Sequence, residues 1–225
     1  MKNPPLRILV TAGPTREYLD PVRFISNEST GVMGVACTQE AYQRGHEVKL
    51  ICGPVSLPEE ERGNFAMIPV VTAREMLSAL QRELSRADAL IMAAAVADFR
   101  PARKAVGKMS KEGKKKLTVK LVRNPDILKI LSRKKGARCL VGFSLETKKG
   151  IKNGWRKLQE KRLDLIVCNR FEGYQVPFGD REVTVALLDR EGRKEWLRGV
   201  SKAEVAKALL DKVEQICYQR RGKGG

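Results

Sequence analysis

The sequence predicts an α/β fold: a doubly wound, mostly parallel sheet with helices on both faces, completed by a C-terminal β-hairpin plus helix. Three observations lead to this prediction. Short apolar runs, which are typical of buried parallel strands, recur along the chain. Segments with helix-start signals separate these runs, and such alternation is typical of βαβ units. The last part of the chain instead has two alternating runs around a turn, followed by one helical segment.

The first strand is predicted at residues 6–12, an apolar run that ends at Gly13. A long connection follows, from Gly13 to about Thr30. A helix then opens near Gly31 and stops at Gly45, because glycine readily adopts the left-handed conformation that ends helices.

The other strands and helices of the parallel part follow the same logic. Residues 89–95 are apolar throughout, which predicts a central strand. Thr72 and Glu75 form a capping box, so a helix is expected to begin there and run to about residue 86. The remaining parallel strands are predicted at residues 47–52, 66–71, 139–143 and 163–168, and a further helix at 151–162.

Residues 99–116 are rich in glycine and lysine and lack periodicity, which predicts a long functional loop, here called the flap. Residues 117–122 alternate like a strand. Asn124 and Pro125 predict a helix start, with Asn124 as the N-cap and Pro125 at the first helical position.

At the C-terminal end, residues 182–188 and 194–197 flank a turn and predict a hairpin. Ser201 and Glu204 form a second capping box that opens a helix to about residue 218. No linker or repeat divides the chain. We therefore expect one domain over residues 1–219 and a disordered basic tail over 220–225.

Composition narrows the classes of function. The formal net charge of +18 favours anionic partners, either nucleic acid or phosphorylated small molecules. The longest apolar run, 89–97, is too short to cross a bilayer, and the N-terminus lacks the features of a signal peptide, so a cytosolic protein is expected. The five cysteines have no paired spacing and are interpreted as buried free thiols. The one histidine, His46, excludes a multi-histidine metal site and is expected to face solvent at a turn.

Ligands of open α/β sheets bind beyond the carboxyl ends of the strands, where four segments should meet. These segments are residues 13–34, 93–116, 124–128 and 143–161. The first is rich in glycine, which lets backbone N–H groups approach an anion, but it contains neither a dinucleotide fingerprint nor a phosphate-binding P-loop motif.

The other three segments supply polar groups for a phosphorylated ligand. Asp98 could accept from a sugar hydroxyl, and a mobile flap carrying Lys108 could fold over phosphates. The helix start at residues 124–128 presents free N–H groups. Lys157 and Lys161 share one helix face, an arrangement better tolerated when an anion lies between them.

Seven segments, in order and spacing, resemble the phosphopantothenate–cysteine ligase family, the ligase half of a bifunctional bacterial decarboxylase/ligase of coenzyme A synthesis. They are TAGPTRE, DPVRFISN, STGVMG, AAAVADFRP, RNPDIL, GFSLET and LDLIVCN. The resemblance covers nearly the whole chain and implies a Rossmann-like sheet. It also implies a reaction in which CTP activates the carboxylate of 4′-phosphopantothenate as an acyl-cytidylate, which the amine of L-cysteine then attacks.

The resemblance also implies which residues bind and react. Asn27 would hold the acyl intermediate, and Lys108 would neutralise the triphosphate during nucleotidyl transfer. Substrate-binding residues would be Arg23, Gly31 and Ala95. Residues around the nucleotide would be Gly13, Ala93, Ala94, Asp98, Lys108, Pro125, Asp126, Ile127, Leu128, Phe143, Lys157 and Lys161. Mg²⁺ would arrive with CTP, with no protein-built metal site and no tightly bound organic cofactor.

The family pattern also sets expectations about partners. It implies a homodimer, built with the C-terminal hairpin, and a separate phosphopantothenoylcysteine decarboxylase acting downstream. The chain departs from the pattern at Ser110, where the family commonly has a flap lysine, so the contribution of Lys111 is left open.

Three alternatives stay open from the sequence. The first is an ATP-using version of the same ligase. The second is a nicotinamide-dependent oxidoreductase, which would need a glycine fingerprint and an acidic residue after the second strand, where this chain has Cys52-Gly53-Pro54. The third is a nucleic-acid-binding protein, which would need exposed aromatic residues among the basic ones; aromatic content is only 5%, so no specific nucleic acid or membrane partner is expected.

Overall fold

An eight-stranded mixed sheet forms the centre of the protein. The computed structural model describes residues 3–56, 63, 65–110, 115–146, 150–170, 179 and 181–222. The strands follow the order β12-β11-β10-β9-β6-β1-β4-β5. Their bounds are β1 Arg7–Ala12, β4 Glu47–Cys52, β5 Ala66–Pro69, β6 Ala89–Met92, β9 Cys139–Glu146, β10 Leu165–Arg170, β11 Val183–Asp189 and β12 Lys194–Val200.

The first six strands of this sheet in chain order are parallel, and the order reverses between β1 and β6. The last two, β11 and β12, are antiparallel and form the expected hairpin. The predicted doubly wound α/β fold is therefore confirmed. A reversal of strand order leaves a crevice at the carboxyl ends of the central strands, where ligands of such sheets bind.

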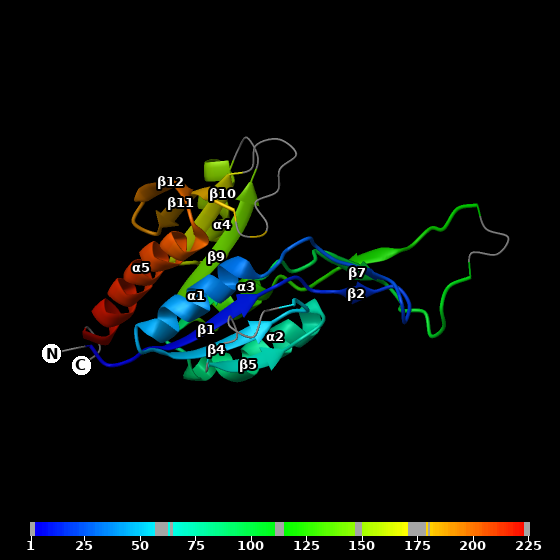
Figure 1. Cartoon of the computed structure of the whole chain (residues 1–225), viewed down its shortest axis with the longest axis horizontal. Coiled ribbons are helices and arrows are strands. Elements are labelled where there is room, and N and C mark those ends of the chain that lie inside the picture. The colour runs from blue at the N-terminus through cyan, green and yellow to red at the C-terminus, as the bar shows by residue number, and fades with distance from the viewer. Residues whose placement is uncertain are drawn as a thin grey trace.

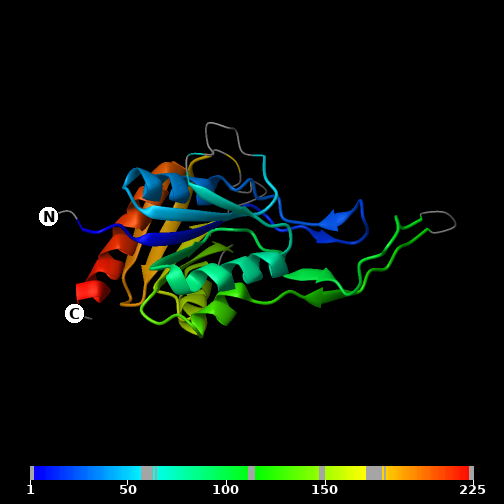
Figure 2. The ribbon, with the colours of Figure 1, turned by 90° about the horizontal axis from the view of Figure 1, so that it is seen from below.

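Helices cover both faces of the sheet (Figures 1 and 2). Helices α1 (Val32–Gln43) and α5 (Lys202–Gly222) pack on one face. On the other face lie α2 (Ala73–Glu83), α3 (Ile127–Ser132) and α4 (Gly150–Glu160). Side chains of β1 alternate between the two cores, as a strand buried on both faces requires.

The predicted capping side chains agree with the structure at two helix starts and differ at a third. Thr72 caps α2, and the Ser201–Glu204 capping box opens α5. For α3 the N-cap is Asp126, whose carboxylate accepts from the backbone N–H of Lys129, and not Asn124 as predicted. The Asn124 amide instead donates to the carbonyl of Ala97, which removes it from the capping role.

A long arm extends from the carboxyl ends of the strands (Figures 1 and 2). It contains two antiparallel ribbons, β2 (Glu17–Tyr18) with β3 (Phe24–Ile25), and β7 (Phe99–Pro101) with β8 (Leu121–Arg123). Residues 13–30 and 99–101, which were predicted to be a long connection and a loop, therefore contain short strands. Both ribbons are too short to produce a recognisable alternating pattern.

Residues 220–222, predicted as the start of a disordered tail, belong to helix α5. Helix α5 continues to Gly222 because Arg220 and Arg221 bind acidic partners on the sheet. Arg220 lies 2.6 Å from the Asp164 carboxylate, and Arg221 lies 2.8 Å from that of Asp88. Residues 223–225 lie outside the described residues.

Two further expectations concern the cysteines and the histidine. All five cysteines are buried and free, as predicted. His46, however, is buried rather than solvent-facing: its Nδ1 accepts from the backbone N–H of Leu6, and its Nε2 lies 3.0 Å from Glu214 of α5. In the part of the chain that the structure describes, no helix has the length and apolar character needed to span a bilayer.

Candidate functional site

Two adjoining pockets lie at the carboxyl ends of the sheet. The first, here the α3 pocket, has a volume of about 480 Å³ and is bordered by β6, the start of α3, and α4. The second, here the α1 pocket, has a volume of about 540 Å³ and is bordered by the start of α1 and the ends of β9 and β10. Five residues line both pockets: Ala94, Val96, Asp98, Phe143 and Lys157. A ligand filling one pocket would therefore touch a ligand filling the other.

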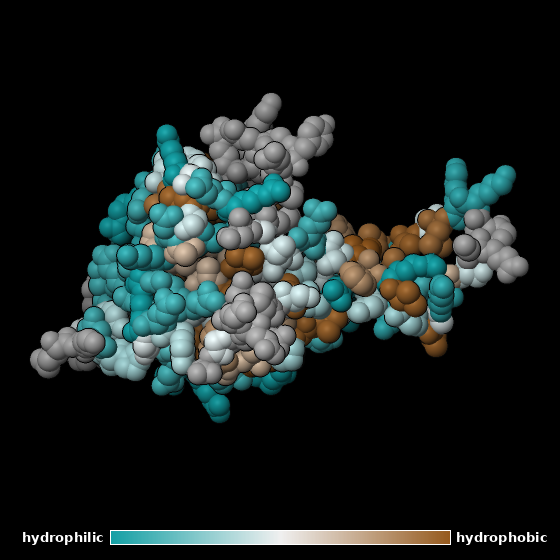
Figure 3. Space-filling model, viewed as in Figure 1, coloured by the Kyte–Doolittle hydropathy of each residue, from teal (hydrophilic) through white to brown (hydrophobic). Residues whose placement is uncertain are grey.

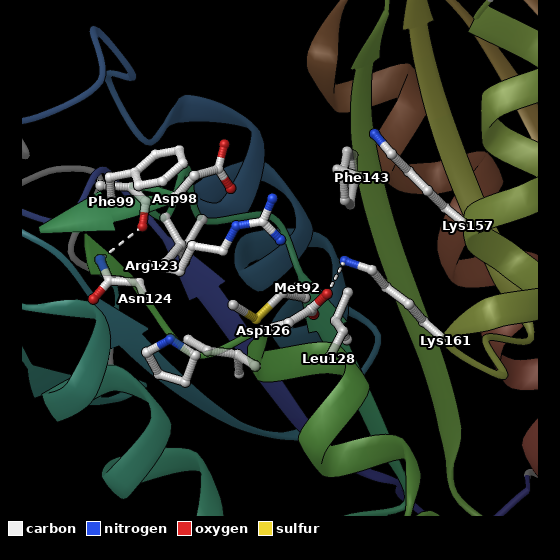
Figure 4. A pocket seen from close by; sticks show the side chains of 15 residues that line it. Met92, Asp98, Phe99, Arg123, Asn124, Asp126, Leu128, Phe143, Lys157 and Lys161 are labelled. Atoms are coloured by element: carbon white, nitrogen blue, oxygen red, sulfur yellow. Dashed lines mark hydrogen bonds and ion pairs between the residues drawn. The ribbon is translucent and has the colours of Figure 1, made fainter. Parts of the chain in front are cut away.

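The α3 pocket brings together most of the residues predicted around the nucleotide. Figure 4 shows Phe143 and two lysines facing Asp98, Phe99 and Arg123 across the pocket. Of the twelve predicted nucleotide-binding residues, nine line it: Ala94, Asp98, Pro125, Asp126, Ile127, Leu128, Phe143, Lys157 and Lys161. Segments far apart in the sequence thus converge as the strand-end argument requires.

Charged side chains in the α3 pocket are held by neighbours. Lys161 forms a 2.9 Å ion pair with Asp126, the N-cap of α3 (Figure 4). Lys157, one helical turn away on α4, donates to the hydroxyl of Ser144 at 2.7 Å. Together with Arg123, the two lysines bring three cations to the pocket, counted over the described residues, against the two carboxylates of Asp98 and Asp126. This balance favours an anionic ligand.

The α1 pocket contains the start of α1. Gly31, its N-cap, has a φ of +83° and makes no side-chain cap bond, and no acidic residue occupies the first turn. The N–H groups of the first helical turn and the helix dipole therefore face the pocket, with no acidic side chain in that turn. Such a terminus is suited to a phosphate.

Small residues bring backbone close to the α1 pocket. Ala93, Ala94 and Ala95 follow β6 and line it. The N–H of Ala94 donates to Thr11 Oγ1, and the carbonyl of Ala95 accepts from the Asn27 side chain at 3.0 Å. Asn27 is exposed and lines the same pocket, so its amide is positioned beside the wall that the two pockets share.

Three predicted site residues line neither pocket: Gly13, Arg23 and Lys108. Gly13 has a φ of +77° and packs against Gly53, where an added side chain would collide with Val55 at 2.9 Å. Its role in the structure is to let two strand-end turns approach closely. Arg23 lies on the turn between β2 and β3, and Lys108 is exposed on the arm.

Asp20 organises this part of the arm. Its buried carboxylate accepts from the backbone N–H groups of Val22, Arg23 and Met109, and lies 3.5 Å from the Arg23 guanidinium. Burial alone would raise the pKa of Asp20, but these hydrogen bonds and the Arg23 charge together lower it below its usual value. Arg23 and the residue after Lys108 thus share one anchor.

Several residues that line the pockets were not among those predicted. Phe99 and Arg123 line the α3 pocket from the ribbons of the arm, and Asn169 and Lys202 line the α1 pocket. One signal was available for Asn169, because it follows the buried run 163–168 at a position where strand alternation calls for an apolar side chain. Lys111 and Thr147 lie outside the described residues. The contribution of Lys111 to the flap therefore stays open.

Comparison with known proteins places the chain in a family. Residues 5–217 match the model of the DNA/pantothenate metabolism flavoprotein C-terminal domain. The coenzyme A biosynthesis bifunctional protein CoaBC of Bacillus subtilis (strain 168) is 40% identical over 212 residues, which cover 94% of this chain and 52% of that protein. The chain thus spans about half the length of the curated relatives it matches.

Solved structures agree with this placement. The crystal structure of the C-terminal domain of CoaBC is similar, with a TM-score of 0.80 and 34% identity over 95% of this chain and 96% of that one. A Cab2 mutant solved in complex with phosphopantothenate-cysteine shares the fold, with a TM-score of 0.77 and 18% identity over 96% of this chain and 89% of that one.

Proposed function

Because the chain belongs to the family of DNA/pantothenate metabolism flavoprotein C-terminal domains, we propose that it is a phosphopantothenate–cysteine ligase of coenzyme A biosynthesis. In the first step, a carboxylate oxygen of 4′-phosphopantothenate attacks the α-phosphorus of CTP, and pyrophosphate leaves. In the second, the amine of L-cysteine attacks the acyl carbon and CMP leaves. The products are 4′-phosphopantothenoylcysteine, CMP and pyrophosphate.

The observation that carries this proposal is the pair of pockets with a common wall. CTP would occupy the α3 pocket, with Lys157, Lys161 and Arg123 near its phosphates. 4′-Phosphopantothenate would occupy the α1 pocket, with its phosphate at the α1 N-terminus beside Gly31. Two anionic substrates would then meet at the shared wall, which is the geometry that a transfer between them requires.

Individual residues contribute through binding and charge. Asn27, held at the carbonyl of Ala95, would donate to or accept from the acyl-cytidylate without adding charge. Phe143 offers an aromatic surface to the base, and Asp98 an acceptor to the ribose hydroxyls. Cations near the triphosphate stabilise negative charge as it develops.

Mg²⁺ is proposed as a companion of CTP. Within the described residues, no group of three or more potential ligands is arranged to hold a metal, and one of the two carboxylates of the α3 pocket, Asp126, is paired with Lys161. These residues fit an Mg²⁺ ion that is held mainly by the phosphate oxygens of CTP, with Asp98 as the carboxylate available to it from the protein. When bound, the ion would neutralise phosphate charge.

We also propose a homodimer, built through the arm rather than through the C-terminal hairpin expected earlier. The arm exposes six large apolar side chains, and Figure 3 shows brown patches on the arm. These are Val22, Phe24, Phe99, Val106, Leu117 and Leu121. An apolar surface of this kind favours a protein partner. A second copy would also supply Arg23 and Lys108, which line neither pocket of their own chain.

Mixed dimers test whether Lys108 acts across the dimer. Neither Asn27→Asp nor Lys108→Gln alone should support ligation. If the two residues serve one site from different subunits, an equal mixture should regain about a quarter of wild-type activity, because half the dimers are mixed and each has one intact site. No recovery after subunit exchange would place both residues in the same chain's site.

The remaining parts of the proposal follow from the reaction. The product carries a carboxylate from cysteine, so a decarboxylase would act on it next, and a cytosolic location suits a pathway of soluble phosphorylated intermediates. The nicotinamide alternative is disfavoured because β4 ends at Cys52 without an acidic residue.

The direct test is product formation. Purified protein with 4′-phosphopantothenate, L-cysteine, CTP and Mg²⁺ should yield 4′-phosphopantothenoylcysteine, detected by mass spectrometry, with one CMP and one pyrophosphate per product. Omitting cysteine should leave pyrophosphate release intact for a single turnover. Absence of product with both CTP and ATP would overturn the proposal, whereas product with ATP alone would overturn only the choice of nucleotide.

A further inference from the structure

Two of the five free cysteines lie side by side in the core between the sheet and α5. Cys139 is the first residue of β9 and is fully buried, whereas Cys217, near the C-terminal end of α5, is 4% exposed. The Sγ of Cys217 donates to the carbonyl of Asp88 at 3.7 Å, and the backbone N–H of Cys139 donates to the same oxygen at 2.9 Å. The two thiols are also hydrogen-bonded to each other. The fold thus brings together two sulfur atoms that are far apart in the sequence.

Arg220 lies next to this thiol pair. Its guanidinium, about one helical turn after Cys217, donates to the carbonyls of the two residues that precede Cys139, at 3.2 and 3.0 Å. The hydrogen bond from the Cys139 thiol and the two arginine charges at the end of α5 lower the pKa of Cys217, although its burial acts in the opposite direction. The same thiol contact, together with burial, raises the pKa of Cys139. Cys217 is therefore the thiol that ionises first, and the thiolate is the reactive form of cysteine.

We infer that Cys217 and Cys139 form a redox-active pair, which reacts with hydroperoxides and closes to a disulfide. The sulfur of Cys217 attacks one oxygen of hydrogen peroxide, the O–O bond breaks, and the other oxygen leaves as water, so that Cys217 becomes a sulfenic acid. The sulfur of Cys139 then attacks the sulfenic sulfur. The S–S bond forms, the S–O bond breaks, and the Cys139 proton leaves with the hydroxide as a second water. Two thiols and one hydrogen peroxide thus give one disulfide and two waters.

Two other core cysteines differ from this pair in their acidity. Cys37 is fully buried in the same core, and its burial raises the pKa of its thiol to about 12. Burial likewise raises the pKa of Cys52 to about 11. Neither thiol is expected to ionise near neutral pH, so both should react slowly with peroxide. Cys37 therefore provides an internal reference for the reactivity of Cys217.

The pair lies at the end of the sheet opposite both ligand pockets. Cys139 opens β9 and is in register with Ala89, the first residue of β6, whereas both pockets lie at the carboxyl ends of the strands. The inference therefore does not depend on the proposed function. A disulfide here would fasten the end of α5 to the sheet and would close a long loop of the unfolded chain. The oxidised protein is thus expected to be more stable than the reduced one.

Peptide mapping of the full chain tests the inference. Reduced protein is treated with a small excess of hydrogen peroxide, unfolded, alkylated and digested with trypsin, which releases peptides 139–148 and 213–220. We expect these two peptides to be linked, with a mass about 2 Da below their sum, and a reductant should separate them. Cys37 should be oxidised at a rate at least about tenfold lower. The Tm should rise by about 5 °C or more on oxidation.

Single replacements separate the roles of the two thiols. In Cys139→Ser the sulfenic acid at Cys217 has no resolving thiol, so dimedone should trap it and further peroxide should convert it to sulfinic acid. In Cys217→Ser the buried Cys139 should stay reduced. Cys37→Ser is the matched control from the same core, and it should form the disulfide at the wild-type rate. Alanine replacements at the same two positions serve as second variants in case serine perturbs folding.

Several results would overturn the inference. One is the absence of the linked peptides after peroxide treatment of the wild-type protein. Another is equally fast linkage of either cysteine to Cys37, or a Tm that does not rise on oxidation, because the bond would then form only after the fold opens. A dimedone adduct at Cys139 in Cys217→Ser would contradict the assignment of Cys217 as the attacking thiol. None of these measurements involves ligation, so none bears on the proposed function.

Discussion

The Asp20 carboxylate accepts a hydrogen bond from the backbone N–H of Met109, 3.1 Å away and separated from it by 89 residues in the sequence. This bond joins the turn of the β2–β3 ribbon to the segment that carries Lys108. A second link, from the N–H of Ala105 to the carbonyl of Leu19, runs in parallel at 2.9 Å. The position of Lys108 therefore depends on the β2–β3 turn.

We predict that Asp20→Asn loosens the arm and leaves the sheet intact. In the wild type, three backbone N–H groups donate to the Asp20 carboxylate. In the variant, the side-chain amide nitrogen would replace one carboxylate oxygen and face an N–H group that it cannot accept from, so at least one of the three hydrogen bonds is lost. Limited proteolysis should cut between residues 102 and 120 faster than in the wild type, while the Kd for CTP is unchanged. Equal cleavage rates in the two proteins would contradict the role of Asp20.

For Lys157 and Lys161 we predict separate effects on nucleotide binding. Lys157→Met and Lys161→Met should each raise the KM for CTP about tenfold, because each removes a charge-assisted contact with an anion. In ligand-free protein, Lys161→Met also leaves Asp126 without its ion-pair partner in the pocket.

CTP should support ligation better than ATP, and chelation of Mg²⁺ should abolish ligation. Comparable kcat/KM for CTP and ATP would contradict the nucleotide preference.

Asn27→Asp places a negative charge beside an anionic intermediate. The side chain donates to the carbonyl of Ala95 through its Nδ2, a contact that a carboxylate would replace with repulsion. We expect cysteine addition to suffer more than acyl-cytidylate formation, measured by quench-flow with and without cysteine. Equal slowing of both half-reactions, or of neither, would count against this role.

Much of the sheet could be predicted from sequence because each parallel strand is buried on both faces. Such strands appear as continuous apolar runs, and the predicted run 47–52 coincides with β4. The arm could not be predicted in the same way, because its ribbons are short and one of them pairs the first residues of the flap with residues 121–123, beyond its end. Long-range pairing of this kind leaves no local pattern.

The same distinction applies to the site. Residues 93–95 and 124–128 follow strands or open a helix, so the strand-end rule predicts where they lie. Residues brought in by the arm, such as Phe99 and Arg123, depend on tertiary pairing that the pattern does not reveal. The helical state of residues 220–222 was not predicted for a related reason: the acidic partners of Arg220 and Arg221, Asp164 and Asp88, are distant in sequence.

A substitution at Asp164 tests whether its ion pair with Arg220 stabilises the end of α5. Its buried carboxylate contacts Arg220 at 2.6 Å, Lys135 at 2.5 Å and the N–H of Leu140. Removing the charge with Asp164→Asn would leave Lys135 buried beside uncompensated positive charge, and we expect a loss of about 3–5 kcal/mol in the free energy of unfolding. Arg7→Ala, at an exposed arginine that lies 3.9 Å from Asp88, should cost about 1 kcal/mol at most.

The pH dependence of the same cluster has a definite sign. Burial raises the pKa of Asp164, but hydrogen bonds from Arg220, Lys135 and Leu140 outweigh it, so the folded-state pKa lies below the ordinary value of 3.8. A carboxyl with a depressed folded-state pKa stabilises the protein fully above its unfolded pKa and progressively less as the pH falls through the folded value. Urea denaturation should therefore show wild-type stability falling more steeply than that of Asp164→Asn below about pH 4.

Lys108→Gln tests the charge delivered by the arm. Glutamine keeps a donor and most of the length but removes the positive charge, which is exposed in the ligand-free protein and lies outside both pockets. Its contribution would arise only after CTP binds, so we expect an unchanged Kd for CTP and a loss of about 10²–10³ in the rate of acyl-cytidylate formation, or ~3–4 kcal/mol.

Pyrophosphate release with 4′-phosphopantothenate present and cysteine omitted isolates this step. Lys104→Gln is the matched control, because Lys104 lies on the same arm but its ammonium rests over the ring of Tyr18, 4.9 Å from the centroid. That variant should release pyrophosphate at a rate within about twofold of wild type. Lys111→Gln should be milder than Lys108→Gln, since Ser110 suggests a flap that relies chiefly on its first lysine. Wild-type release from Lys108→Gln would remove that lysine from the mechanism, and an equal loss in Lys104→Gln would indicate a general effect of arm charge.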